Sequence, residues 1–143
     1  MAELKTTDLK RALVAAGLEV FRVRDEEVHL AERQNVQLME AGIRVKSGTA
    51  PRISVVVRAQ RNDSPTVSEA VLYALIRERS EPLVLAGYRE EQAASREIRS
   101  VSDDHVVDVW YEIVWVRQTT SIEDAVNEAR RAIAIDRYVV SMS

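Results

Sequence analysis

Hydrophobic residues near the N-terminus recur at helical spacing. They follow the i, i+3, i+4, i+7 pattern of one helix face, at Leu9, Ala12, Leu13 and Ala16. Thr6 or Thr7 precedes this stripe and suits an N-terminal cap. Gly17 follows it, and glycine tolerates the left-handed conformation that commonly ends a helix. The pattern predicts a first helix that ends at Gly17.

Alternating apolar and polar positions then replace the helical spacing and predict strands. The first two runs flank an acidic turn and are typical of a hairpin. A turn that contains Gly48 and Pro51 separates the later runs. The predicted strand segments are Leu18–Arg24, Glu27–Glu32, Val36–Ala41, Ile43–Lys46 and Ile53–Gln60.

A second helix is predicted over Thr66–Arg79, where Thr66 and Glu69 have the spacing of a capping box. This helix is apolar on two sides, and Leu72 and Ile76 project from the side opposite to its main apolar face. A helix that is apolar all round is normally buried on both sides. Leu72 and Ile76 therefore contact either a dimer mate or a second buried side of the same chain. We favour the dimer, because so small a domain seldom covers both sides of a central helix.

The second half of the chain contains the strongest β pattern, over Val106–Arg117. Before it, Leu83–Leu85 is compatible with a short strand or a packed turn, and the polar segment Tyr88–Arg99 with a helix, an edge strand or a loop. A last helix is predicted to begin at Ser121 and to extend to about Val139.

Consecutive strands precede the middle helix, an order typical of an antiparallel α+β sheet rather than of βαβ units. A length of 143 residues favours one domain. We expect a single α+β domain over residues 1–143, with an antiparallel sheet and three helices in the order α-βββ-α-ββ-α.

The long predicted strand has apolar residues on both faces. Its core face consists of Val107, Val109, Tyr111, Ile113 and Trp115. Trp110 lies on the other face, beside Asp108 and Glu112. An aromatic side chain with acidic neighbours can anchor a protein partner or an arginine-bearing peptide. Alternatively, a helix or loop of the same chain covers Trp110 together with Val114 and Val116.

Composition removes most kinds of reactive site. The chain has no cysteine, two histidines that are 76 residues apart (His29 and His105), and four glycines that are never closely spaced. This excludes thiol catalysis, iron–sulfur clusters, Cys/His zinc sites and phosphate-binding loops. A net charge of -3 gives no general signal for nucleic acid. We expect no catalytic residue, cofactor or metal, no nucleic-acid partner, and a solvent-facing His29 on the hairpin.

No segment approaches the roughly 20 consecutive apolar residues that span a bilayer. Met1–Arg11 is polar and lacks the apolar stretch of a secretory signal. Together with the absence of cysteine, these features favour a cytoplasmic location and no membrane partner.

The order of the elements resembles the type III secretion chaperone-like fold, which includes Tir-type chaperones and YbjN-like bacterial domains. The similarity covers nearly the whole chain and rests on these segments: helix Thr7–Ala16 ending in Gly17-Leu18, strand Ile53–Gln60, helix Thr66–Arg79, strand Val109-Trp110-Tyr111-Glu112-Ile113, and a closing helix with Ala129, Ile133 and Tyr138. The resemblance implies a non-enzymatic α+β homodimer that binds proteins through apolar surface. It implies no catalytic residues.

The function favoured by the sequence is a non-enzymatic protein-binding module, chaperone-like or regulatory, that acts as a homodimer and binds an unidentified protein partner. Leu72 and Ile76 are the candidate residues for self-association. Trp110, Val114 and Val116 are the candidates for a second contact surface.

Two other functions stay open. One is a small-ligand-binding domain or enzyme with a pocket between sheet and helices, for which Tyr73, Tyr111 and His105 are the visible polar candidates. The other is a subunit of a larger assembly in which residues 88–99 become ordered on contact.

Overall fold

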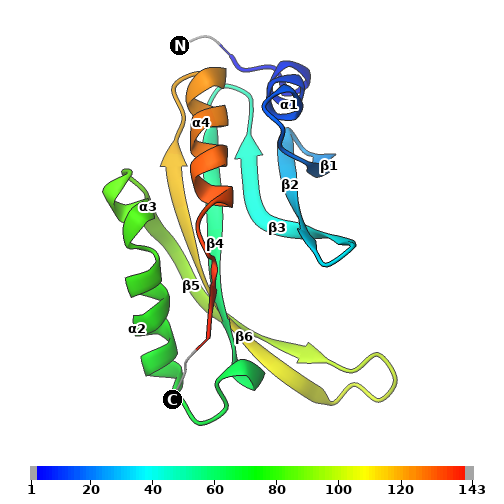
Figure 1. Ribbon diagram of the computed structural model, residues 1–143, viewed down its shortest axis with the longest axis vertical. Helices are drawn as coiled ribbons and strands as arrows, with labels where there is room; N and C mark the ends of the chain where they lie inside the picture. The colour runs from blue at the N-terminus through cyan, green and yellow to red at the C-terminus, as the bar shows by residue number, and fades with distance from the viewer. Residues whose placement is uncertain (1–2, 141–143) are drawn as a thin grey trace. The chain divides into compact units, whose positions relative to one another are not determined.

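The computed structural model describes residues 3–140 and has an α+β fold with a seven-stranded sheet (Figure 1). The helices are α1 (Thr6–Ala15), α2 (Glu69–Arg79), α3 (Glu81–Leu85) and α4 (Ile122–Ile133), with a short 3-10 turn η1 (Arg61–Asp63). The strands are β1 (Val20–Arg24), β2 (Glu27–Gln34), β3 (Gln37–Lys46), β4 (Arg52–Gln60), β5 (Arg89–Arg99), β6 (Val106–Gln118) and β7 (Tyr138–Val139).

The strand order is β1-β2-β3-β4-β6-β5. The printed registers of β1 with β2, β2 with β3 and β3 with β4 are antiparallel, whereas β7 pairs in parallel with β4. The predicted α+β class with an antiparallel sheet is confirmed. The helix count differs, because α3 adds a fourth helix to the three that the sequence predicted.

The chain forms two compact units, each built from two parts of the sequence. The first consists of the chain up to Val55 together with Val116–Ile135, and it contains α1, β1, β2, β3 and α4. The second consists of Val56–Trp115 and the residues from Asp136 onward, and it contains α2, α3, β5 and β7. Strands β4 and β6 each contribute residues to both units.

The core of the first unit lies where α1 and α4 pack against β2 and β3. Leu9 and Leu13 of α1 are fully buried, and Ala125, Ala129 and Ala132 give α4 a buried face of small side chains. Gly17 ends α1 as predicted: its φ is +86°, and the Leu18 N–H donates to the Leu13 carbonyl at 3.1 Å.

The predicted cap of α1 is wrong, because Lys5 occupies the N-cap position without a side-chain hydrogen bond. The Thr6 hydroxyl is instead bonded to the Ser47 hydroxyl at 2.6 Å.

The predicted hairpin is present, with Asp25 and Glu26 at positive φ in its two-residue turn. His29 does not face solvent as expected, since it is only 2% exposed. The pairing register shifts between Val20 and Arg22 and again between His29 and Ala31. The extra residues lie in β1 and β3, so β2 keeps its own alternation of faces. Val28–Ala31 are all buried because β2 lies between β1 and β3, and Arg22 of β1 and Glu40 of β3 contact the His29 ring.

The second unit departs most from the predicted elements. Ser68, not Thr66, caps α2, and its hydroxyl accepts from the Val71 N–H. Residues 83–85 belong to helix α3 rather than to a strand or packed turn, and residues 89–99 form the strand β5. The last helix ends at Ile133 instead of about Val139, because Asp136 accepts the Tyr138 N–H and the chain then pairs with β4 as β7.

Candidate protein-interaction site

The second face of β6 carries a stack of one indole and two guanidinium groups. The Arg58 guanidinium carbon lies 4.1 Å from the centre of the Trp110 ring, and that of Arg96 lies 4.8 Å from it. Arg58 comes from β4 and Arg96 from β5, the two neighbours of β6 in the sheet. Cation–π contacts of this kind hold three adjacent strands through one side chain.

Glu112 bridges the two arginines of this stack. Its Oε2 accepts from Arg58 Nη2 at 2.7 Å and Nε at 2.9 Å, and its Oε1 lies 3.0 Å from Arg96 Nε. The Arg58 and Glu112 side chains are each 18% exposed. One carboxylate therefore offsets the repulsion between two cations in a partly buried place.

Asp108 fixes the orientation of the indole. Its carboxylate accepts from Trp110 Nε1 at 3.1 Å and from the backbone N–H of Asn62 at 3.0 Å. The Asn62 side chain also donates to the Val107 carbonyl at 2.8 Å. Asp108 thus ties the turn η1 to β6, which explains why this residue is only 8% exposed, whereas Val106, Val109 and Trp110 around it are half-buried.

The cations beside the half-buried Trp110 ring come from neighbouring strands of the same chain, and not from the covering helix or loop that the sequence offered as an alternative to a partner. That Trp110 contacts a protein partner stays a prediction. Sequence reasoning placed Asp108 and Glu112 beside Trp110 but missed Arg58 and Arg96. Their contribution depends on strand pairing between distant segments, for which the local pattern carries no signal.

The other predicted contact residues lie in different surroundings. Leu72 and Ile76 are 0% exposed, so the prediction that they form a dimer surface is wrong: both belong to the core of the second unit. The helix is covered on that side by its own chain. Val116 is also buried, at 6% exposed, and Val114 is half-buried. Leu72, Ile76 and Val116 are buried, and none of them can contact a partner unless the chain unfolds locally.

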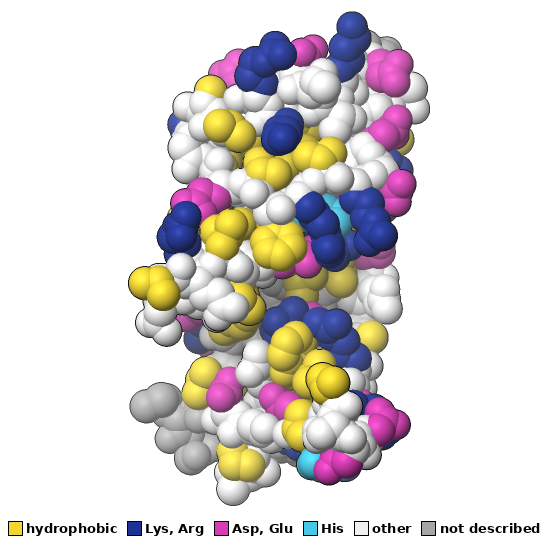
Figure 2. Space-filling model, turned by 90° about the vertical axis from the view of Figure 1, so that its right-hand side faces the viewer, with side chains coloured by type: hydrophobic (Ala, Val, Ile, Leu, Met, Phe, Trp, Pro, Cys, Tyr) yellow, Lys and Arg dark blue, Asp and Glu magenta, His cyan; other side chains and the backbone are white. Residues whose placement is uncertain are grey.

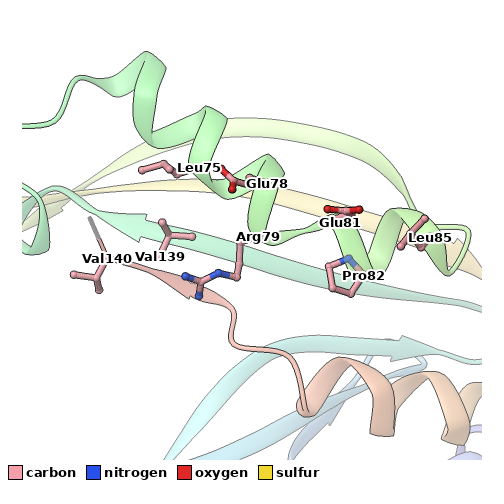
Figure 3. Close-up of a pocket in the computed structure, with 8 residues that line it drawn as sticks. All are labelled: Leu75, Glu78, Arg79, Glu81, Pro82, Leu85, Val139 and Val140. Atoms are coloured by element: carbon pink, nitrogen blue, oxygen red, sulfur yellow. The ribbon is translucent and has the colours of Figure 1, made fainter. Parts of the chain in front are cut away.

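A groove of about 620 Å³ runs between α2, α3 and the C-terminal strand (Figure 3). Its apolar lining comes from Leu75 of α2, Pro82 and Leu85 of α3, Val139 of β7 and the following Val140. Leu85 is 79% exposed and Val140 49% exposed. Large aliphatic side chains with this exposure beside a groove are typical of a contact surface.

The charged side chains at the groove differ in whether they have a hydrogen-bond or ionic partner. Arg79 is engaged: its Nη1 lies 2.7 Å from Asp136 Oδ2 and donates to the Tyr138 carbonyl at 3.3 Å. Glu78 and Glu81 also line the groove, and no hydrogen bond or ion pair joins their carboxylates to any of residues 3–140. The free charge at the groove is therefore negative.

Figure 2 shows basic side chains in groups beside hydrophobic ones, with acidic side chains among them. A mixed cluster of basic and acidic side chains surrounds His29 in the first unit. Arg22 Nε donates to its Nδ1 at 3.0 Å, and Glu27 and Glu40 lie within 3.7 Å of the ring. Burial, with a contribution from Arg44, lowers the pKa of His29 below its ordinary value.

The polar candidates for a small-ligand pocket are in two places. Tyr73 and Tyr111 meet edge to face with ring centres 5.7 Å apart, and burial raises the pKa of Tyr73. His105 lies in the turn between β5 and β6, where its ring bonds to Asp103 and lowers the pKa of that carboxyl. Over residues 3–140, no cluster of three or more His, Cys, Asp and Glu side chains has the arrangement of a metal site.

None of the described helices combines the length and the apolar character needed to cross a bilayer. The fold and the groove thus define an α+β protein with a candidate docking surface in its second unit. Comparison of the chain with protein-family models, with curated proteins and with solved structures gives no match. The resemblance to the type III secretion chaperone-like fold stays a prediction.

Proposed function

We propose that the chain is a non-enzymatic protein-binding module, chaperone-like or regulatory, that acts as a homodimer. Its partner is an apolar peptide segment that carries a lysine or arginine. The observation that carries the proposal is the groove between α2, α3 and β7, with Leu85 79% exposed beside it.

The chemistry of the groove supports this partner. Apolar side chains of a peptide remove water from Leu75, Pro82 and Leu85, and that burial supplies the affinity. Glu78 and Glu81 have no ionic partner within the described chain, and a basic side chain complements them. An acidic segment is disfavoured by the same two carboxylates.

The alternative function, a small-ligand-binding domain or enzyme, needs several polar groups that converge on one pocket. Arg79 is held by Asp136 and by the Tyr138 carbonyl, which leaves Glu78 and Glu81 as the available polar groups among the described lining residues. This arrangement favours a peptide over a small polar substrate.

A random-peptide display selection tests the proposal. The wild-type protein should enrich apolar sequences with a basic residue, and the enrichment should disappear with Leu85→Asp. Val84→Asp is the matched control, because Val84 is the neighbouring α3 residue, is 48% exposed and does not line the groove. Equal enrichment on wild type and Leu85→Asp, or selected peptides without basic residues, would refute the proposal.

A further inference from the structure

Strand β5 is an edge of the sheet that is open over an unusual length. It has 11 residues, about twice a typical strand, and contains neither proline nor glycine. It stands last in the strand order, and β6 is its single described neighbour. Ten of its residues are exposed, Ile98 being the half-buried exception. The backbone groups along its outer side are therefore available to another strand.

The charges of β5 are distributed unequally between its two halves. Arg89, Glu90 and Glu91 give the first half a net negative charge, whereas Arg96, Glu97 and Arg99 give the second half a net positive charge. Between them lie the small residues of the segment 93–95. An antiparallel pairing of two β5 strands places each acidic half beside the basic half of the other copy, while a parallel pairing places like charges together.

We propose that β5 joins a second copy of this chain, antiparallel and around a two-fold axis at Ala93. This inference rests on the homodimer of the proposed function and gives it a surface in place of Leu72 and Ile76. An isologous strand pair of this kind is self-complementary, as a two-fold interface requires.

The register follows from the charges opposite one another. With Ala93 opposite Ala93, Arg89 lies opposite Glu97, and the symmetry repeats this pair. Glu90 lies opposite Arg96, although Arg77 and Glu112 of their own chain already pair with these two side chains. A shift that places Ala94 on the axis instead sets Arg89 against Arg99 and Glu91 against Glu97, two repulsive pairs. Opposite charges favour the first register and like charges disfavour the second.

The pairing also supports the far end of the β5–β6 hairpin, which extends beyond α2 and α3 of the same unit (Figure 1). A two-stranded ribbon without a covering layer is marginally stable in water, and a third strand stabilises it. The second copy supplies that strand.

Disulfide formation in single-cysteine variants tests the register, and the natural chain contains no cysteine that would interfere. Facing residues of an antiparallel pair have Cα atoms about 4.5–5.5 Å apart, within the range of a disulfide. Ala93→Cys should therefore oxidise to a covalent dimer. Ala94→Cys is the matched control, because its two copies lie diagonally, about 7–8 Å apart.

Light scattering and sedimentation provide the second readout. Wild type should have twice the 16.1 kDa mass of one chain. Arg89→Glu should weaken the dimer by about tenfold in Kd, because it opposes Glu97 of the other copy at two symmetric positions, and adding Glu97→Arg should restore it.

A wild-type mass of one chain at the highest soluble concentration, or cross-linking of Ala94→Cys as fast as Ala93→Cys, would overturn the inference. Its failure is distinguishable from a failure of the peptide binding that the proposed function assigns to the groove. Leu85→Asp should lose peptide binding and remain dimeric, whereas Arg89→Glu should dissociate and still bind peptide.

Discussion

The indole of Trp110 contacts two arginines of its own chain, and one carboxylate holds both of them. Arg58, Arg96 and Glu112 come from three strands, and none of these contacts is local in sequence. The stack therefore links β4, β5 and β6 within the second unit. Its loss should lower the free energy of unfolding and leave peptide binding in the groove unchanged.

Glu112→Gln tests this role. The amide of glutamine keeps one acceptor oxygen, but the negative charge that both guanidinium groups share is lost and an NH2 donor replaces the second oxygen. The free energy of unfolding should therefore fall by about 1–3 kcal/mol. Urea denaturation measures the change. Glu19→Gln, which breaks an exposed pair with Arg33, should cost no more than about 0.5 kcal/mol. Equal effects of the two substitutions on the free energy of unfolding would contradict the role of Glu112 in linking the three strands.

His29 gives the stability a dependence on pH. The ring is surrounded by Arg22 of β1, Glu27 of its own strand and Glu40 and Arg44 of β3, and its pKa is lowered in the folded state, chiefly by burial. The unfolded chain therefore binds a proton more readily than the folded chain. Stability is unaffected well above the ordinary pKa of 6.5 and decreases as the pH falls below it.

Urea denaturation at pH 7.5 and 5.5 measures this effect. Wild type should lose more stability between the two pH values than His29→Asn, in which the amide oxygen still accepts from Arg22 and no ring titrates. The same loss in both proteins would exclude His29 as the source.

At the scale of single residues, the sequence indicated which positions are apolar or polar, but it did not predict what surrounds each side chain in the fold. The two-sided apolarity of the middle helix was visible, but whether a mate or the chain itself covers Leu72 and Ile76 depends on long-range packing. Likewise, the burial of His29 follows from the side chains of Arg22 on β1 and of Glu40 and Arg44 on β3, which strand pairing brings to the ring.

Among the secondary-structure elements, strong local signals were predicted well and weak ones were not. Long strands with clear alternation, such as β4 and β6, were recognised, and so was the glycine stop of α1. The short helix α3 was missed because five residues carry too little periodicity. The end of α4 was missed because Asp136 and the pairing of β7 with β4 compete with the helix, and this pairing is long-range.

The cap of α2 provides a direct comparison between sequence pattern and structure. Ser68 accepts the Val71 N–H, whereas Thr66 lies outside the helix. Ser68→Ala should lower the free energy of unfolding by about 1 kcal/mol, as expected for loss of an N-cap, and Thr66→Ala should change it by less than about 0.5 kcal/mol. A larger loss with Thr66→Ala, measured by thermal or urea denaturation, would favour the capping box of the sequence pattern.

The sequence predicted that the candidate site is a contact surface, but it did not predict where that surface lies. The sequence indicated surplus apolar surface and few reactive groups, which favours contact over catalysis. It did not indicate the groove, because Leu75, Leu85 and Val139 come from three segments that only folding brings together.

For the whole molecule, the continuity of β4 and β6 through both units is the main constraint. Because each strand belongs to both units, we expect one cooperative unfolding transition. Trp110 and Trp115 both lie in the second unit, so their fluorescence reports on that unit, while far-ultraviolet circular dichroism reports on the whole chain. Coincident urea transitions are expected, and separate midpoints would show that the units unfold independently.

The central claim is that the molecule works by binding a protein segment in the groove of its second unit. The most direct measurement is a binding titration of one selected apolar, basic peptide against wild type, Leu85→Asp and Val84→Asp. We predict at least a tenfold loss of affinity for Leu85→Asp, because a charge replaces an exposed anchor, and a change within about twofold for Val84→Asp. Equal affinity of all three proteins for the peptide would contradict the account.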